Sequence, residues 1–353
     1  MRRLVIGAAI AGLALLCALV AWQGWRDVLR AFAHAGWPLL LVVPVRLGTL
    51  ALDAWAWRIL LEPWLPLPAG PGRDTAAGAA PPRPPGLAYL LWVASVREAI
   101  NRLLPAAGVG GELAGVRLAR LRIPDTAGVT ASVIVEVLIT IAVLYLFCGL
   151  GLVLMAHVAA GMGQVWVVGA SLLLSLPLPL LAWWLLRGGQ SFRRLEALAL
   201  RLSGDRIVAG LGLDGAALDA AVARLFGRRL LLLRALGWQL LSYFAGSFET
   251  WYALRLLGHP VDLPTALAIE ALTQAARHAG FMVPAGLGVQ EAATVLFGHL
   301  AGVGGDVSLS LALVKRMREI LIGVPALLSW QWFEAGRWQQ ENIKGPRCAP
   351  PGS

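Results

Sequence analysis

The sequence predicts an all-α protein: a polytopic inner-membrane helical bundle with two inverted, Gly/Pro-broken re-entrant segments. Three observations support this fold class. The 353-residue chain is 58% hydrophobic and only 14% charged, and several apolar runs are long enough to cross a bilayer. Residues 97–112 and 277–291 repeat one interrupted pattern. Basic residues gather at the ends of apolar runs, as the positive-inside rule describes.

We expect one integral-membrane domain over residues 1–340, followed by a cytoplasmic tail over residues 341–353. The domain is expected to contain two pseudo-repeat halves, about 1–160 and 229–340. A basic cytoplasmic segment, residues 187–229, connects them. Because lysine and arginine collect near the termini and in the long loops, both termini are predicted to be cytoplasmic.

The first half begins with an apolar run from Leu4 to about Trp22, which we interpret as the first membrane helix rather than a signal peptide. The second span runs from Trp37 to about Leu61 and carries Arg46 and Asp53. These two residues are spaced to share a helix face. They pair with each other through a neighbour, or with charged residues of a repeated segment. Residues 62–86 are rich in Pro, Gly and Ala and predict a cytoplasmic loop.

Further spans are predicted downstream, and one of them carries Glu136. Within the basic segment, arginines alternate with leucines over Phe192–Leu202, which is typical of an amphipathic helix on the membrane surface. The predicted spans are Thr126 to about Met155, Gln164–Leu186, Leu230–Leu257 and Val307–Phe333.

The two repeated segments share the spacing of a proline and a glutamate. Pro105 precedes Glu112 as Pro284 precedes Glu291, with glycines between them. Paired Gly/Pro-interrupted segments in corresponding halves indicate a transporter binding site. An ionisable residue at mid-membrane costs about 2.5–3.5 kcal/mol, so it usually has a partner and a function. The alternative is that two kinks and two ion pairs only hold helices together.

Each repeated segment is predicted to form a hairpin. Leu87–Leu121 is expected to enter and leave on the cytoplasmic side, and Thr265–Val303 on the outside. This opposite entry is an inverted-topology arrangement. We expect the breaks at Pro105 and Pro284 to meet near the midplane, beside a cavity with an apolar wall and a polar floor. If each arm spans instead, the number of helices changes.

The polar floor is predicted to bind a lipid headgroup. Arginine suits phosphate because its planar fork donates two hydrogen bonds, whereas Glu112 and Glu291 would carry coupling protons or neutralise arginines. The predicted substrate-binding residues are Arg97, Asn101, Arg102, Pro105, Glu112, Arg277, Pro284, Gly286, Gly288, Gln290, Glu291, Arg316, Arg318 and Glu319.

Other function classes find little support. The formal charge of +10 is not accompanied by a nucleic-acid-binding motif, so no nucleic-acid partner is expected. Cys17, Cys148 and Cys348 are far apart, and the five histidines lack ligand spacing. We therefore expect no metal, no cofactor and no disulfide framework. The sequence contains no Walker motif and no catalytic motif, so no catalytic residue is predicted.

Three stretches carry a family resemblance: Phe281–Glu291, Leu313–Glu319 and Pro325–Trp330. There the sequence resembles the flippase-like family that shares the transmembrane region of lysylphosphatidylglycerol synthase, in particular its hopanoid-biosynthesis-associated members. Asn101–Pro105 and Gly110–Glu112 match the broader family. The resemblance covers essentially the whole chain. It implies an inner-membrane protein that moves or handles a lipid.

The resemblance also limits the expected activity. Synthase members carry a second, soluble domain that aminoacylates a lipid, and we expect none here because the chain ends at residue 353. The predicted function is therefore a membrane lipid transporter or flippase-like protein, for hopanoid or another lipid. An integral-membrane lipid-modifying enzyme and a scaffold for lipid-biosynthesis enzymes remain the alternatives. Expected partners are the lipid and other lipid-biosynthesis or transport proteins.

Overall fold

The computed structural model describes residues 36–65, 85–104, 110–158, 169–170, 173, 176–188, 192–193, 214–280 and 288–343. Within this part of the chain every regular element is a helix, which confirms the predicted all-α class. The elements are η1 (Trp37–Leu41), α3 (Val42–Leu61), η2 (Glu62–Trp64), α4 (Leu87–Leu103), α5 (Gly110–Ala119), α6 (Thr126–Val158), α8 (Pro177–Arg187), α11 (Gly215–Phe226), α12 (Arg229–Leu256), α13 (Leu263–Ala279), α14 (Val289–Leu300) and α15 (Gly305–Ile343).

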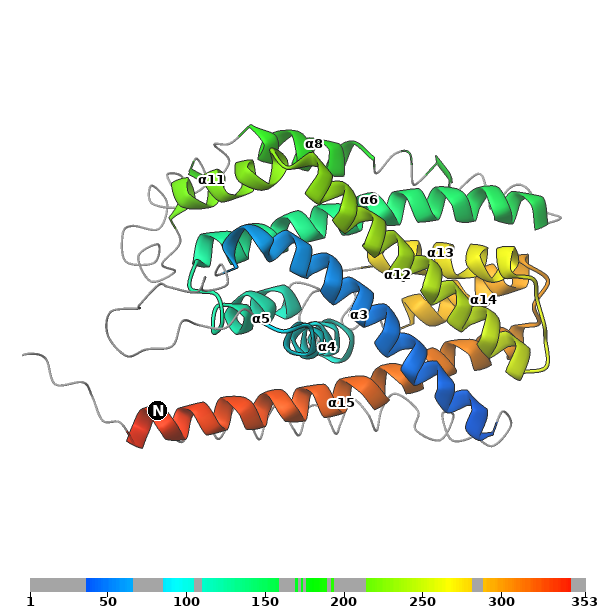
Figure 1. Cartoon of the computed structure of the whole chain (residues 1–353). Helices are drawn as coiled ribbons and strands as arrows, with labels where there is room; N and C mark the ends of the chain where they lie inside the picture. Colours follow the sequence, from blue (N-terminus) through cyan, green and yellow to red (C-terminus); the bar gives the residue numbers. More distant parts are fainter. Residues whose placement is uncertain are drawn as a thin grey trace, which may run out of the picture.

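Long helices form the frame of the bundle, and α3, α6, α12 and α15 agree with four predicted spans (Figure 1). By length and composition, two described helical stretches could cross a membrane, Trp37–Trp64 and Thr126–Val158. Large apolar side chains stay exposed on the outer faces of the bundle, as lipid contact would allow; examples are Leu146, Val153, Leu233 and Phe248.

Helices α4 and α5 form the first hairpin. At its open end, the Tyr89 hydroxyl donates to the backbone carbonyl of Leu118 at 2.7 Å. Near the break, the Gly111 N–H donates to Asn101 Oδ1 at 2.9 Å. The start of α4 thus lies beside the end of α5, and the end of α4 lies beside the start of α5. The chain therefore enters and leaves this hairpin at one end of the bundle. Pro105 falls in residues 105–109, outside the described part.

The hairpin packs so closely because α5 presents glycine to α4. A Cβ atom added at Gly111 would lie 2.3 Å from the Arg97 carbonyl oxygen, and one at Gly115 would lie 2.6 Å from Arg97 Cδ. Any side chain at Gly111 therefore has to push the α4 backbone away. These two glycines of α5 thus allow the helices to approach and place Arg97 between them.

We expect Gly111→Ala to lower the free energy of unfolding by about 1–3 kcal/mol, the cost of forcing atoms into a packed contact. Gly246→Ala in α12 is the matched control, because a Cβ there meets nothing within 4 Å. It should be neutral or slightly stabilising, since alanine favours helix over glycine. Thermal unfolding of the purified variants in detergent measures both. Equal melting temperatures for the two variants would contradict this packing.

Helices α13 and α14 form the second hairpin. Asp262 caps α13 by accepting from the Thr265 N–H at 3.2 Å, at the outer end of the hairpin. Gly280 and Val289 meet at the inner end, where a Cβ on Gly280 would lie 2.8 Å from Val289. Gly288 has a positive φ of 78°, which suits glycine at the turn into α14. Pro284 and Gly286 fall in residues 281–287, outside the described part.

The two hairpins enter from opposite ends of the bundle. Figure 1 shows α4 and α5 towards the left and α13 and α14 towards the right. Their inner ends touch, because Arg102 at the end of α4 donates to Gln290 Oε1 at the start of α14, at 3.3 Å. The inverted arrangement predicted from the repeated pattern is therefore present in the structure.

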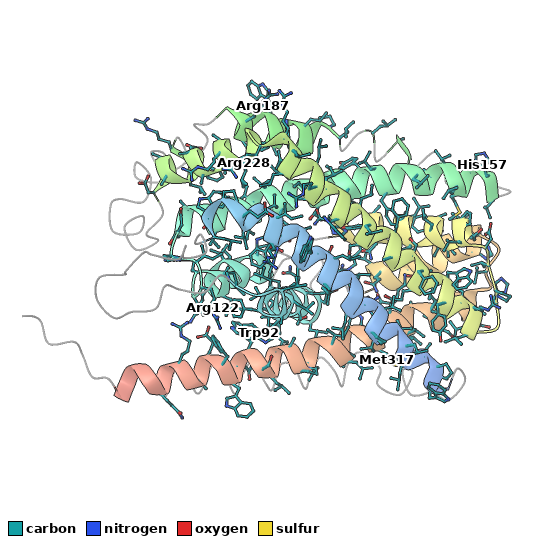
Figure 2. The ribbon with its side chains drawn as sticks, viewed as in Figure 1. Trp92, Arg122, His157, Arg187, Arg228 and Met317 are labelled. Carbon is teal, nitrogen blue, oxygen red and sulfur yellow. The ribbon has the colours of Figure 1, made fainter. Side chains whose placement is uncertain are left out.

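One end of the bundle is basic. Arg187, Arg228 and Arg122 lie towards the left in Figure 2, whereas His157 lies at the right. Ion pairs tie this end together: Arg117 to Glu334 at 2.9 Å, and Arg234 to Glu62 at 4.0 Å. The opposite end contains the turns before α13 and before α15. Its charged residues include Asp262, Arg255 and Asp306, so it lacks the basic excess of the first end.

The basic connecting segment differs from its prediction. Residues 187–229 contain α11, which the sequence interpretation did not foresee. Asp214 caps this helix by accepting from the Ala216 and Ala217 N–H groups, and its apolar face packs against α6 through Leu218, Val222 and Leu225. The segment is therefore partly a packed helix and not only a loop. Of the predicted helix Phe192–Leu202, only residues 192–193 are described.

Two other boundaries changed. Within the predicted span Gln164–Leu186, α8 begins at Pro177, since proline at the first helical position has no hydrogen bond to lose. The last helix is longer than predicted and runs to Ile343. The predicted first membrane helix, Leu4–Trp22, lies outside the described residues.

Candidate functional site

Glu319 of α15 lies at the centre of a buried group of charges where the hairpins meet. Its carboxylate contacts Arg102 at 2.8 Å, Arg316 at 3.0 Å and Arg318 at 3.7 Å. Gln290 donates to the same carboxylate at 3.5 Å. The Glu319 side chain is only 1% exposed, so three arginines from two helices converge on one carboxylate away from solvent. We call the group of Arg102, Gln290, Arg316, Arg318 and Glu319 the central cluster.

Two further carboxylates, Glu98 and Glu249, lie beside the central cluster. Glu98, one turn before Arg102 on α4, lies 3.4 Å from the Arg102 guanidinium and also pairs with Arg46 of α3. Glu249 of α12 pairs with Arg318. Arg46 thus pairs with a residue of the first repeated segment, which is one of the two pairings predicted for it from the sequence. Helices α3, α4, α12, α14 and α15 all contribute a charged or polar side chain.

Glu291 begins α14 and has two roles. Its carboxylate accepts from the Gly288 N–H at 2.9 Å, which gives a partner to a backbone donor at the start of the helix. It also lies 3.0 Å from the Arg316 guanidinium. From the sequence, Glu291 and Arg277 are both predicted to line the polar floor. In the structure, Glu291 pairs with Arg316. The reason is that Glu291 lies on the first turn of α14, facing α15.

Four of the five arginines in this region have a carboxylate within ion-pair distance, and Asp53 adds a further acidic group near Arg46. Arg46, Arg102, Arg316 and Arg318 are matched by Glu98, Glu249, Glu291 and Glu319, as described above. Arg277 adds a fifth cation, near enough to Arg102 and Glu319 to interact electrostatically. Among the described residues no carboxylate forms an ion pair with Arg277. The site therefore has one arginine to offer to an anionic group.

Arg97 lies in a separate buried group, which we call the first-hairpin cluster. Its guanidinium contacts Glu112 of α5 and lies 2.9 Å from Glu136 of α6. Asn101 approaches Glu112 at 3.4 Å. The guanidinium also packs over the Trp57 ring, 4.8 Å from its centroid. Arg97 is thus already engaged by two carboxylates, so the structure places it apart from the central cluster.

A third buried pair joins α13 to α15. Lys315 contacts Glu270, which also accepts from Gln274 at 2.8 Å and from Thr250. Both carboxylate oxygens of Glu270 are hydrogen-bonded, so we assign this pair a structural role. Glu270 was not predicted from the sequence, although its place in an apolar helix two turns before Arg277 is a recognisable signal.

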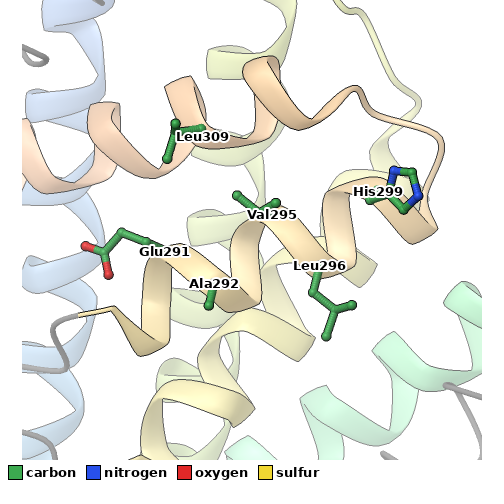
Figure 3. Close-up of a pocket in the computed structure, with 6 residues that line it drawn as sticks. All are labelled: Glu291, Ala292, Val295, Leu296, His299 and Leu309. Atoms are coloured by element: carbon green, nitrogen blue, oxygen red, sulfur yellow. The ribbon is translucent and has the colours of Figure 1, made fainter.

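An apolar groove begins at Glu291 and runs along the outer side of α14. It has a volume of about 540 Å³ and is lined by Glu291, Ala292, Val295, Leu296, His299 and Leu309. Figure 3 shows Glu291 at one end, His299 at the other, and Val295 facing Leu309 of α15. Its walls are aliphatic except at these two ends. The cavity predicted between the two breaks would involve residues 105–109 and 281–287, which lie outside the described part.

The predicted site residues thus fall into groups. Arg102, Gln290, Arg316, Arg318 and Glu319 form the central cluster, with Gly288, Glu291 and Arg277 beside it; Arg97, Asn101 and Glu112 belong to the first-hairpin cluster. Pro105, Pro284 and Gly286 are not described. Sequence reasoning overlooked Glu98, although its i,i+4 spacing to Arg102 is a recognisable signal. Within the described residues, no group of histidine, cysteine and acidic side chains could hold a metal ion.

Comparison with known protein families matches residues 5–326 to the lysylphosphatidylglycerol synthase TM region. The chain belongs to this family. It is a membrane protein linked to lipid biology, and the family match extends through both hairpins and most of α15. No curated protein and no solved structure matches the chain. The family assignment therefore rests on the family comparison and agrees with the inverted hairpins and the buried charges.

Proposed function

We propose that this protein moves a lipid across the membrane, as a flippase-like transporter of hopanoid or another lipid. The observation that carries the proposal is the contact between Arg102 and Gln290, which joins the inner ends of two oppositely inserted hairpins inside a buried charge cluster. Inverted broken segments that meet around polar groups are the usual construction of a transporter site. Residues 1–340 act as one membrane domain with two pseudo-repeat halves.

The central cluster suits the headgroup of such a lipid. Arg277 supplies an arginine that pairs with no described carboxylate, and arginine binds phosphate or carboxylate through two parallel hydrogen bonds. Gln290 and the Gly288 turn add neutral polar groups beside it. An anionic headgroup that leaves water would therefore meet protein groups that are already oriented to bind it. This supports an anionic lipid over a neutral one.

The groove along α14 suits the hydrocarbon part. Glu291 belongs both to the groove and to the edge of the central cluster, through its contact with Arg316. A lipid could thus keep its tail against aliphatic side chains while its headgroup lies in the polar interior. Such separation lowers the cost of crossing, because neither part enters an unfavourable environment.

The test is lipid movement by the purified full chain in liposomes. We expect a fluorescent anionic phospholipid to change leaflets faster in liposomes that hold the protein, measured by the fraction accessible to an impermeant quencher. A rate no faster than that of protein-free liposomes overturns the proposal. In that case a scaffold role, or an enzyme found by headgroup modification of the probe, takes its place.

Filling the groove should slow lipid movement without unfolding the protein. Leu309→Trp puts a larger side chain into the groove, and the side chain can stay in the apolar layer because Leu309 is already exposed. We expect a several-fold lower rate in the liposome assay and an unchanged melting temperature. Leu233→Trp on the outer face of α12 is the matched control, and its rate should equal that of the wild type. Equal rates for both variants would remove the groove from the mechanism.

The basic end of the bundle is proposed to face the cytoplasm of a bacterial-type inner membrane, with both termini inside. A single cysteine at Arg122, in a chain whose native cysteines are replaced, should react with an impermeant maleimide only after the cells are opened. A cysteine at Asp306, at the opposite end, should react in intact cells. Labelling of the Arg122 position in intact cells would reverse the topology.

A further inference from the structure

The first-hairpin cluster is not balanced in charge. Among the described residues, Arg97 is the one cation in ion-pair contact with Glu112 and Glu136, so the group carries one negative charge more than it can neutralise. The Glu136 side chain is 10% exposed. Its Oε2 atom is buried and has no hydrogen-bond donor within the described residues, although it lies in ion-pair contact with Arg97. A second ionised carboxylate in such a place is costly unless it binds a proton.

Apart from Arg97, the charged neighbours of Glu136 in the described part of the chain are acidic. The helices packed near it contribute Arg97 from α4, Glu112 from α5 and Asp53 from α3. Asp53 is also acidic, and its buried Oδ1 atom has no hydrogen-bond partner within the described residues. One turn further along α6, Gln239 of α12 donates to the Thr140 hydroxyl at 2.6 Å and brings no charge. The local field thus favours a proton over any anion.

We infer that one exchangeable proton is carried by either Glu112 or Glu136, the two carboxylates that contact Arg97. We also infer that this proton is the coupling ion for lipid movement. The coupling part of this inference rests on the proposed function, whereas the proton site does not. With the proton bound, one carboxylate and one guanidinium remain and the cluster is neutral. With the proton released, two carboxylates compete for Arg97.

The two carboxylates differ in how far they are exposed at the surface of the protein. Glu112 is 23% exposed and lies at the start of α5, beside the break in the hairpin. Glu136 is the more deeply buried partner. A proton can therefore arrive at Glu112 and be shared with Glu136 across the guanidinium. No bond other than an O–H bond forms or breaks, and water at the hairpin supplies and takes up the proton.

Helix α4 connects this site to the proposed headgroup site. Arg97 belongs to the first-hairpin cluster, and its neighbour Glu98 pairs with Arg46 and contacts Arg102. A change of charge around Arg97 therefore occurs next to Glu98, which contacts Arg102 of the central cluster. Protonation of the first-hairpin cluster changes its charge and so changes the electric field at the headgroup site. Proton binding at one site therefore affects anion binding at the other.

The proton site is tested without transport, by infrared difference spectroscopy of the purified full chain during a pH titration. We expect a protonated-carboxyl band in the wild type that is absent from Glu136→Gln. Glu112→Gln should also lack it, because Glu136 then has Arg97 to itself. Glutamine has the shape of a protonated glutamate, so both variants should fold. Glu334→Gln is the control and should keep the band. A band that survives in both cluster variants, or that is absent from the wild type, overturns the inference.

Coupling is tested with a pH gradient across liposomes that hold the fluorescent anionic phospholipid. We expect the gradient to accelerate lipid movement by the wild type and by Glu334→Gln, but not by Glu136→Gln. If the wild type moves lipid at the same rate with and without the pH gradient, the inference is overturned and the proposed function stands. If the wild type shows the carboxyl band but moves no lipid, the proton site is supported and the proposed function is overturned.

Discussion

Replacing Glu319 with alanine should leave little folded protein. Three arginines contact this one carboxylate, and its side chain is almost wholly buried. Removing one partner of a buried ion pair costs about 3–5 kcal/mol, because the remaining charge is left without compensation. Most domains are stable by only about 5–15 kcal/mol, so this loss is a large part of the total. The yield of monodisperse protein on gel filtration, and its melting temperature, measure the effect.

The control for this prediction is Glu334→Ala. Glu334 also pairs with an arginine on the same helix bundle, but that partner, Arg117, is 63% exposed. A solvent-exposed pair contributes about 0–1 kcal/mol, so this variant should behave like the wild type. If Glu319→Ala melts at the same temperature as Glu334→Ala, then the central cluster does not hold the hairpins together.

Arg277→Gln should have the opposite profile, with a large loss of lipid movement and little loss of stability. No described carboxylate is left unpaired when its charge is removed. A hydrogen bond to a charged group contributes about 1.5–3 kcal/mol, so the rate for an anionic lipid probe should fall roughly 10- to 100-fold. The liposome assay measures the rate, and thermal unfolding measures the stability.

The specificity of this effect distinguishes a headgroup contact from a general disturbance. A zwitterionic probe should be affected less than an anionic probe, because it has less net charge to neutralise. Arg117→Gln, which removes an exposed arginine at the basic end, should move both probes at the wild-type rate. An Arg277→Gln variant that moves the anionic probe normally would exclude Arg277 from the site.

The helical frame could be predicted because each long helix has its own apolar composition. Trp37–Leu61 and Thr126–Met155 were recognisable as spans, and the structure places α3 and α6 on them. The hairpins could be predicted because proline and glycine interrupt the helix locally, at the same spacing twice. Helix α11 was overlooked since it lies in a segment dominated by arginine. Its Asp214 cap and its Leu218, Val222 and Leu225 spacing were the available signals.

The charge pairs could be predicted only in kind. The sequence indicates that Glu112 and Glu291 need arginines, but the choice among Arg97, Arg277 and Arg316 depends on how helices distant in sequence are packed. Glu291 and Arg316 are brought together by the angle between α14 and α15. The partnership of Arg46 and Glu98 likewise depends on the packing of α3 against α4. Such long-range contacts follow from tertiary structure and not from spacing along the chain.

Helix α15 sets the depth of the central cluster. Glu319 is thirteen residues from exposed Asp306 at one end and thirteen from Trp332, which is 82% exposed, at the other. At a rise of about 1.5 Å per residue, each distance is about 20 Å, so the cluster lies midway. In the proposed transport, with the two membrane surfaces at these exposed residues, a monovalent anion that moves from either surface to the cluster would cross about half of the transmembrane voltage. This corresponds to about 1.2 kcal/mol at 100 mV. In the proposed function, the voltage would therefore act with equal weight on the entry of a charged headgroup from one surface and on its release at the other.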